Sequence, residues 1–253
     1  MKLLIIALLL FSATSLSAQT NAKPDPNFHL YLLAGQSNMA GRGPVDAESK
    51  EINPQIFMLD KNNKWVPATD PVHYDKPDVA GVGPAISFAK EMLGNNKKIK
   101  IGLIPCAVGG SPIRVWSPDS VYLPPFHPYD DAIRRTKLAQ QSGVLKGIIW
   151  HQGESDNNKE GVQIYMKKLK ELIERFRLDL LVPDLPFVAG EIGYFKNDIL
   201  INNVIDSLPG RVPKTAVVSA KALKDKGDQT HFDTPSAREL GKRYAAEMKK
   251  LER

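Results

Sequence analysis

The chain has 253 residues, a formal net charge of +6 and a single cysteine, Cys106. One cysteine excludes an intramolecular disulfide, and its apolar surroundings favour a buried small side chain over a catalytic thiol. The Lys and Arg residues are dispersed, without the interleaved aromatics or recognition motif typical of nucleic-acid binders. We therefore expect no nucleic-acid partner. The length of the chain fits one α/β domain.

The N-terminus has the pattern of a secretory signal peptide. A basic residue, Lys2, precedes an apolar run over residues 3–11 and a small, polar segment, with cleavage predicted after Ala18. The run is much shorter than the roughly 20 residues that span a bilayer, and no cysteine near the cleavage zone offers a thiol for a lipid. We predict a signal peptide over residues 1–18, one domain over 19–253, no membrane anchor, and a secreted or periplasmic location.

Short β-type runs alternate with helical patterns along the rest of the chain. Several of these runs are apolar on consecutive residues, which is typical of parallel strands that are covered on both faces. We predict an α/β fold, a three-layer α/β/α sandwich with a central, mainly parallel five-stranded sheet. The predicted strands are residues 30–34, 99–105, 144–150, 186–190 and 215–220.

Three segments have the three- and four-residue apolar spacing of amphipathic helices. They cover about residues 84–93, 162–176 and 234–251, and Pro235 suits the first turn of the last one. Residues 56–69 contain two short β-type runs around Asn62 and Asn63, which predicts a small hairpin inserted at the edge of the sheet.

Four unusual segments follow predicted strands and therefore meet at one edge of the sheet, where open α/β proteins bind ligands. They are GQSNMAGRG (35–43), AVGGSPIRVW (107–116), HQGESDNN (151–158) and KALKDKGDQTHFD (221–233).

Ser37 directly follows the first of these strands and is flanked by Gly35 and Gly41. A serine becomes an effective nucleophile only when a base removes its proton. The α/β-hydrolase motif G-x-S-x-G fails here, because Met39 stands where glycine is required. On the local sequence alone, a turn-former or helix N-cap is the better interpretation of Ser37.

His231 is the candidate base, and Asp228, three residues earlier, can hold its ring in one tautomer. An isolated D-x-x-H pattern is more often only the entry to a helix. Acyl transfer also needs donors for an oxyanion. Gly110, after a predicted strand, offers a closely approaching backbone N–H, and Gln152 offers a side-chain amide; a turn and a structural hydrogen bond are equally good interpretations of these two.

Taken together and in this order, AGQSNMAGRG, AVGGSPIRVW, WHQGESD and DQTH resemble the SGNH hydrolases. The resemblance is closer to the branch that contains sialic acid-specific O-acetylesterases and the acetylxylan esterases of carbohydrate esterase family 6, and it extends over residues 28–250. It implies a flavodoxin-like SGNH fold and a serine esterase that removes acetyl groups from carbohydrate. It implies no metal and no cofactor.

The resemblance also implies residue roles. Ser37 is the nucleophile, His231 the general base and then acid, and Asp228 the orienting carboxylate. The implied oxyanion hole consists of the N–H groups of Ser37 and Gly110 and the side chain of Gln152, where the wider superfamily has Asn.

Further substrate contacts are implied near Arg114 and Trp116, in a segment where Ser111 departs from the commoner threonine of this branch. Glu154 is a second carboxylate in the same region and is an alternative triad acid or a supporting group. We favour Asp228, because its closeness in sequence to the histidine makes the geometry easy to achieve.

Two rival functions stay open. One is a carbohydrate-binding protein without catalysis on the same scaffold, and it disagrees with the presence of every required catalytic group. The other is a metal-dependent hydrolase that uses His151, Glu154, Asp228 or His231. We disfavour it, because H-x-x-E is common and lacks a third ligand at fixed spacing.

Overall fold

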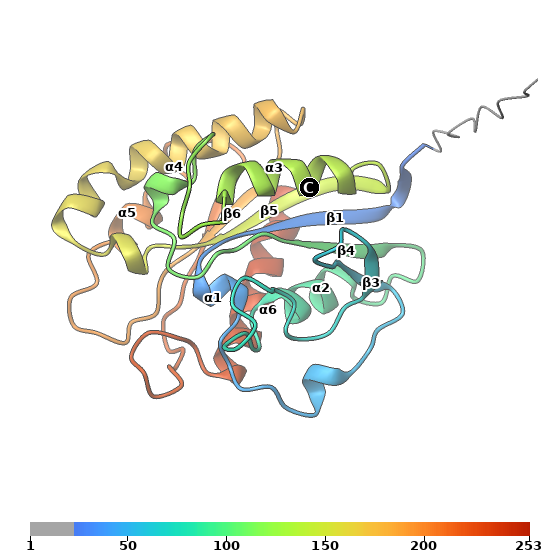
Figure 1. Ribbon diagram of the computed structural model, residues 1–253, viewed down its shortest axis with the longest axis horizontal. Coiled ribbons are helices and arrows are strands. Elements are labelled where there is room, and N and C mark those ends of the chain that lie inside the picture. The colour runs from blue at the N-terminus through green and yellow to red at the C-terminus, as the bar shows by residue number, and fades with distance from the viewer. Residues whose placement is uncertain (1–22) are drawn as a thin grey trace, which may run out of the picture.

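A mostly parallel sheet of seven strands lies at the centre of the protein, with helices on both faces (Figure 1). This computed structural model describes residues 23–253, so the predicted signal peptide lies outside the described residues. The strand order is β3-β2-β4-β1-β5-β6-β7. The strands are β1 (Asp25–Gly35), β2 (Ile56–Leu59), β3 (Trp65–Pro67), β4 (Lys100–Pro105), β5 (Gly143–His151), β6 (Phe187–Gly190) and β7 (Thr215–Val218).

The helices form two layers, which confirms the predicted α/β class. In Figure 1, α3, α4 and α5 lie on one face of the sheet, and α1, α2 and α6 lie on the other. The helices are α1 (Ser37–Ala40), α2 (Ala85–Leu93), α3 (Pro128–Ala139), α4 (Lys159–Asp179), α5 (Asn202–Asp206) and α6 (Thr234–Leu251), and single 3₁₀ turns cover Glu48–Lys50, Ile113–Val115 and Glu154–Asp156. No helix within residues 23–253 is both long enough and apolar enough to cross a membrane.

The sheet has two more strands than the predicted five, because the hairpin is part of it. Strand β2 pairs with β4 in parallel, and β3 pairs with β2 in the antiparallel sense. A turn at residues 60–64 joins the two strands. The predicted hairpin therefore extends the edge of the central sheet.

Strand β1 occupies the middle of the sheet and faces a hydrophobic core on each side. Leu30 and Leu32 belong to the core below α3 and α4, whereas Tyr31 and Leu33 belong to the core against α2 and α6. This alternation follows from the two-residue period of a strand. All four side chains are completely buried, so the backbone that leads to Ser37 is fixed by packing on both faces.

Gly35 ends β1 where the strand comes very close to β5. A Cβ atom at this position would lie 2.1 Å from the carbonyl oxygen of His151, and the φ of Gly35 is +127°. Both conditions require glycine. The chain can therefore turn sharply at this point and begin α1 with Ser37, at the edge where β1, β4 and β5 end.

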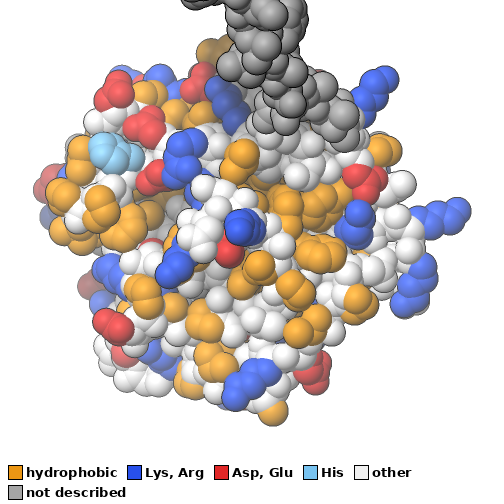
Figure 2. All heavy atoms as spheres, turned by 45° about the vertical axis from the view of Figure 1, so that its right-hand side comes forward, with side chains coloured by type: hydrophobic (Ala, Val, Ile, Leu, Met, Phe, Trp, Pro, Cys, Tyr) orange, Lys and Arg blue, Asp and Glu red, His pale blue; other side chains and the backbone are white. Residues whose placement is uncertain are grey.

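The surface carries charges of both signs. On the face shown in Figure 2, basic and acidic side chains are dispersed among apolar ones. This agrees with the dispersed Lys and Arg residues of the sequence.

Candidate active site

Ser37, His231 and Asp228 form one hydrogen-bonded chain of side chains. The Ser37 hydroxyl lies 3.0 Å from Nε2 of His231, and Nδ1 of the same ring lies 2.7 Å from Oδ2 of Asp228. Ser37 is the first residue of α1 and makes no cap hydrogen bond to that helix. Its hydroxyl therefore faces the imidazole, and the local interpretation of Ser37 as an N-cap is wrong.

The Asp228 carboxylate also organises the loop that carries the imidazole. Its Oδ1 accepts hydrogen bonds from the backbone N–H groups of Thr230, at 3.0 Å, and His231, at 2.8 Å. Burial raises the pKa of Asp228, but these bonds and the bond from the imidazole outweigh it, so that the pKa falls to about 2. Asp228 is therefore a carboxylate at any pH at which the protein would work.

Asn38 connects the nucleophile to this loop. Its Nδ2 donates to the carbonyl oxygen of Thr230 at 2.9 Å, and its Oδ1 accepts from the N–H of Phe232 at 3.1 Å. These two backbone groups flank His231 on either side. One side chain, next to Ser37 in sequence, thus fixes the position of the imidazole.

Glu154 supports Asn38 and has no hydrogen bond or ion pair with His231. Its Oε1 accepts a hydrogen bond from Asn38 and lies 3.6 Å from Nε2 of His151, a ring that is completely buried. Burial raises the pKa of Glu154, but the His151 ring and the bond from Asn38 outweigh it, and the pKa lies below its usual range. Of the two candidate acids, Asp228 is the one in contact with the imidazole.

Two backbone N–H groups face the catalytic pocket. Ser37 and Gly110 both line a pocket of about 470 Å³ together with His231. Within residues 23–253, the N–H groups of Ser37 and Gly110 donate to no backbone or side-chain acceptor. The φ of Gly110 is +84°, and a Cβ there would lie 2.8 Å from the hydroxyl of Tyr122, so this position also requires glycine.

The structure does not bring the amide of Gln152 to the pocket. This side chain is completely buried, and its Nε2 donates to Asp156 Oδ2, to Gln36 Oε1 at 3.1 Å and to the carbonyl oxygen of Ser111 at 3.3 Å. We therefore correct the predicted oxyanion hole at this residue.

Gln36 lines the pocket in place of Gln152. Its Oε1 accepts hydrogen bonds from Gln152 and from the N–H of Ser155, at 3.3 Å. Because both partners are donors, the oxygen must face them and the amide nitrogen must point the other way. Nε2 of Gln36 donates to no acceptor within residues 23–253, which leaves this donor available to a ligand in the pocket.

A buried ion pair holds the loop that contains Gly110. Arg42 Nη2 lies 2.9 Å from Oδ2 of Asp75, and the same oxygen accepts the N–H of Gly109 at 2.7 Å. Both charged side chains are almost completely buried. The bridge of Arg42, Asp75 and Gly109 thus fixes the residue that precedes Gly110.

The two predicted substrate contacts have different positions. Arg114 is exposed and lines a second pocket, of about 620 Å³, that shares Gly110 and Ser155 with the catalytic pocket. Trp116 is buried: its Nε1 donates to the hydroxyl of Ser111, and its ring packs edge-on against Trp150. Trp116 is therefore a core residue, and we withdraw it as a substrate contact.

Cys106 is a buried side chain, as its apolar surroundings predict, and burial raises the pKa of its thiol to about 11. The four side chains that a metal-dependent hydrolase would use form two separate pairs, because His151 contacts Glu154 whereas His231 contacts Asp228. No group of three or more His, Cys, Asp or Glu side chains with the arrangement of a metal site occurs within residues 23–253.

Part of the site was missed by sequence reasoning. Gln36, Asn38 and Arg42 all stand within the motif around Ser37, and two amides beside a candidate nucleophile are a signal that could have been followed. Asp75 had no such signal, because it lies in a loop remote in sequence from every motif.

A serine, a histidine and an aspartate in hydrogen-bonded order, beside free N–H donors at the carboxyl edge of a parallel sheet, define a serine hydrolase of the SGNH type. Residues 27–250 match the family described as "Carbohydrate esterase, sialic acid-specific acetylesterase". The chain belongs to this family and is thus a carbohydrate esterase.

Known proteins agree with this assignment. A probable carbohydrate esterase of Arabidopsis thaliana is 32% identical over 240 residues, which cover 86% of this chain and 89% of that protein. A crystal structure of the same Arabidopsis thaliana protein superimposes with a TM-score of 0.77 at 31% identity, over 89% of this chain and 99% of the other.

Two more distant structures share the fold. NanS has a TM-score of 0.72 at 18% identity, over 89% of this chain and 98% of its own. A carbohydrate acetylesterase from Xanthomonas citri has a TM-score of 0.67 at 20% identity, over 88% of this chain and 56% of its own.

Proposed function

We propose that this protein is a secreted serine esterase that hydrolyses O-acetyl esters on carbohydrate through an acyl-enzyme. The observation that carries the proposal is the hydrogen-bonded chain from the Ser37 hydroxyl through His231 to Asp228. Its distances are those that a nucleophile, a base and an orienting carboxylate require.

Acylation begins when the Ser37 hydroxyl attacks the carbonyl carbon of the acetyl ester and Nε2 of His231 takes its proton. Asp228 stabilises the resulting imidazolium. The negative charge on the carbonyl oxygen is stabilised by the N–H groups of Ser37 and Gly110 and by the amide of Gln36. When this intermediate collapses, the bond to the sugar oxygen breaks and His231 returns the proton to that oxygen.

Deacylation repeats the sequence with water in place of the serine hydroxyl. His231 takes a proton from the water, the hydroxyl attacks the acetyl-serine, and the proton returns to Ser37 as acetate leaves. Besides the ester and water, these steps use side chains and backbone groups of this chain.

A groove beside the pocket supports a carbohydrate leaving group. The pocket around Ser37 continues past Gly110 and Ser155 into the larger one lined by Arg114 and Tyr122. Its other polar lining residues are Asp156, Asn158, Glu160 and Gln163. Hydroxyl groups of a sugar form hydrogen bonds with such donors and acceptors, and an aromatic ring such as Tyr122 packs on a sugar face.

The carbohydrate is of the acetylxylan or the O-acetyl sialic acid type. The sialic acid-specific description of the family and the carbohydrate acetylesterase from Xanthomonas citri support this substrate class. The signal-peptide pattern of residues 1–18 supports secretion to the periplasm or the medium.

Acetate release from a panel of acetylated glycans, with Ser37→Ala as the blank, tests the proposal. We expect wild-type protein to release acetate and Ser37→Ala to keep the fold while losing on the order of 10⁴ or more in turnover. Undiminished turnover in Ser37→Ala contradicts the serine mechanism. Glycan binding without acetate release by the wild type favours the non-catalytic binding protein instead.

A further inference from the structure

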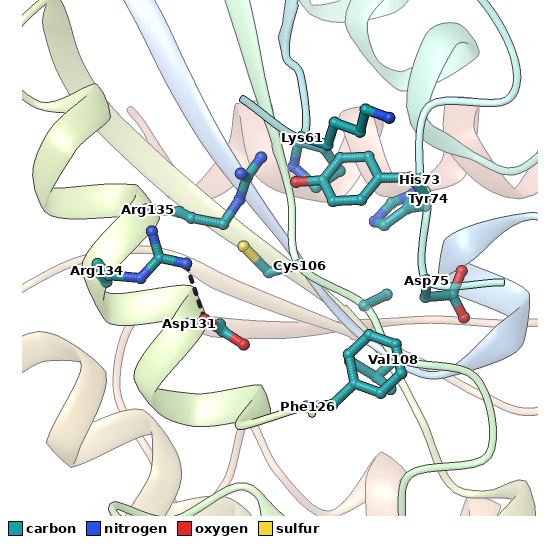
Figure 3. A pocket seen from close by; sticks show the side chains of 12 residues that line it. Lys61, His73, Tyr74, Asp75, Cys106, Val108, Phe126, Asp131, Arg134 and Arg135 are labelled. Carbon is teal, nitrogen blue, oxygen red and sulfur yellow. Dashed lines mark hydrogen bonds and ion pairs between the residues drawn. The ribbon is translucent and has the colours of Figure 1, made fainter. Parts of the chain in front are cut away.

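A further cavity, distinct from the catalytic pocket and from the groove at Arg114, lies between the N-terminal half of α3 and the loop that follows the hairpin. Its volume is about 140 Å³. In Figure 3, Arg134 and Arg135 extend from α3 on one side, Tyr74 lies on the other, and Cys106 lies between them at the back. Lys61 and Arg134 are exposed, so the cavity has a route to solvent.

The bridge of Arg42, Asp75 and Gly109 separates this cavity from the catalytic pocket. Asp75 lines the cavity, while Arg42 and Gly109 line the catalytic pocket. The Tyr122 N–H donates a hydrogen bond to the carbonyl oxygen of Phe126 at 2.9 Å. Tyr122 lines the groove near Gly110, whereas Phe126 lines this further cavity. The cavity is thus adjacent to the groove near Gly110 but is lined by different residues.

The residues around this cavity have an unusual share of buried polar atoms without a partner. Within residues 23–253, five such atoms belong to its lining residues: both ring nitrogens of His73, the hydroxyl of Tyr74, Oδ1 of Asp75 and Nε of Arg135. Native proteins keep few buried polar groups unsatisfied, because each one loses its hydrogen bonds to water. A cluster of them around one space indicates a polar occupant.

The donor and acceptor character of these atoms favours hydroxyl groups. Nε of Arg135 only donates, and the carboxylate of Asp75 only accepts. Burial lowers the pKa of His73 to about 4, so its neutral ring offers one donor and one acceptor. A hydroxyl group both donates and accepts, so it can pair with either kind of atom, whereas a carboxylate ligand only accepts and would leave Oδ1 of Asp75 without a donor.

The size and the aromatic walls favour a ring. An apolar cavity of about 150 Å³ holds a benzene-sized ring. This one is about 140 Å³ and opens to solvent, so a pyranose ring fits with some of its hydroxyl groups in water. Tyr74 and Phe126 supply flat apolar surface beside the polar atoms, as sugar faces require. The guanidinium of Arg135 lies 5.1 Å from the centre of the Tyr74 ring and bonds to the hairpin at Leu59, Asp60 and Asn63, which fixes both side chains.

We propose that the cavity bounded by Tyr74, Cys106 and Arg135 is a second carbohydrate site, which binds one neutral pyranose ring through its hydroxyl groups. The ring belongs either to a further unit of the substrate glycan or to a separate sugar. The site does not depend on the esterase activity, and it would exist on this chain even if the proposed reaction failed.

Calorimetric titration of the mature protein with D-xylose tests this site, with N-acetylneuraminic acid as the anionic probe. We expect xylose to bind with a Kd in the range of about 1–10 mM, as for a small polar ligand, and N-acetylneuraminic acid to bind more weakly. Tyr74→Phe removes a hydroxyl that has no hydrogen-bond partner within residues 23–253 and should weaken xylose binding about fivefold. Cys106→Met fills the cavity and should abolish binding.

Tyr194→Phe is the matched control, because Tyr194 lies outside the cavity and its hydroxyl bonds to Glu191. This variant should bind xylose like the wild type. Thermal melting of all three variants checks the fold. Absence of xylose binding to the folded wild type overturns the proposal, and so does binding that Tyr74→Phe and Cys106→Met leave unchanged. Tighter binding of N-acetylneuraminic acid than of xylose also overturns it, in favour of an anion site.

Kinetics distinguishes the two sources of the ring. If it is a unit of the substrate, the KM of Cys106→Met rises for acetylated xylo-oligosaccharide relative to 4-nitrophenyl acetate. If it is a separate sugar, this ratio of KM values stays that of the wild type while xylose binding is lost. Absence of acetate release by the wild type contradicts the proposed function alone, because xylose binding is measured without turnover.

Discussion

The two halves of the catalytic centre are held by different means. Ser37 follows the central strand, is 7% exposed, and is preceded by a backbone that is packed on both faces. His231 and Asp228 lie in a loop of residues 219–233 with no helix or strand of its own, and their side chains are 23% and 37% exposed. Hydrogen bonds within that loop, and the single side chain of Asn38, replace the core packing.

This difference separates two ways of achieving precision. Around Ser37, many apolar contacts hold the backbone in place, so no single substitution outside Ser37 should displace its hydroxyl far. Around His231, only a few hydrogen bonds hold the loop in place, so removing one partner should displace the imidazole. Substitutions on the two sides should reveal that contrast.

Asp228→Asn should be the most damaging change in the loop. An asparagine cannot stabilise the imidazolium and favours the wrong tautomer, so we expect turnover of an aryl acetate to fall on the order of 10⁴. Glu154→Gln, the matched change at the other acid, should cost about tenfold, because Glu154 acts through Asn38. Turnover measured at matched melting temperature decides between them, and the reverse order would assign the triad acid to Glu154.

Gln36→Glu should reduce turnover by about 10²–10³, as for the loss of one oxyanion donor. The substitution keeps the oxygen that accepts from Gln152 and Ser155 but replaces the amide nitrogen that faces the pocket. The comparison of kcat with KM is informative, since an oxyanion donor acts on the transition state and should lower kcat more than it raises KM. A loss below tenfold with normal folding argues against this role.

Asn38→Ala should lower kcat by about 10- to 100-fold through displacement of the imidazole, because small errors in position are costly. Asn38 is a positioning residue, so a second measurement is needed besides turnover. Hydrogen exchange of the backbone amides in residues 228–233 should become faster, while that of β1 should stay slow. Equal protection of the loop in the wild type and in Asn38→Ala would contradict this positioning role of Asn38.

Asp70→Asn should change the stability of the protein and its dependence on pH. Burial raises the pKa of Asp70 to about 7, although the backbone amide of Gly83 acts in the opposite direction. Gly83 packs against the backbone of Met39 and Gly41, at the end of α1.

The unfolded chain releases the Asp70 proton near pH 4, while the folded protein keeps it up to about pH 7. Stability contributed by this group therefore falls as pH rises from about 4 to 7 and is constant above that window. At about 1.4 kcal/mol per pKa unit, Asp70→Asn should stabilise the protein at pH 8 by at most about 4 kcal/mol and have little effect at pH 4. Urea unfolding at the two pH values measures this, and an equal effect at both would contradict the shifted pKa.

The sequence predicted the sheet and the meeting of Ser37, His231 and Asp228 better than the supporting contacts, and the reason is physical. Apolar runs and the spacing of Asp228 and His231 are local, so a pattern within one segment is enough to predict them. The partners of Gln152 and Glu154 are set by contacts between segments 41 to 116 residues apart. No local pattern indicated that Gln152 would turn inward to Gln36 and Ser111, or that Trp116 would pack on Trp150.

The hydrogen bond between Ser37 and His231 joins residues 194 positions apart in the chain. Strand β1 is the first described element, and α6, which begins three residues after His231, is the last. Contacts at such separation form late, because the intervening chain must be ordered before its ends can meet. A growing polypeptide that ends before residue 231 therefore contains Ser37 without His231. Esterase activity should appear only with the completed fold, which makes turnover a direct reporter of the last step of folding.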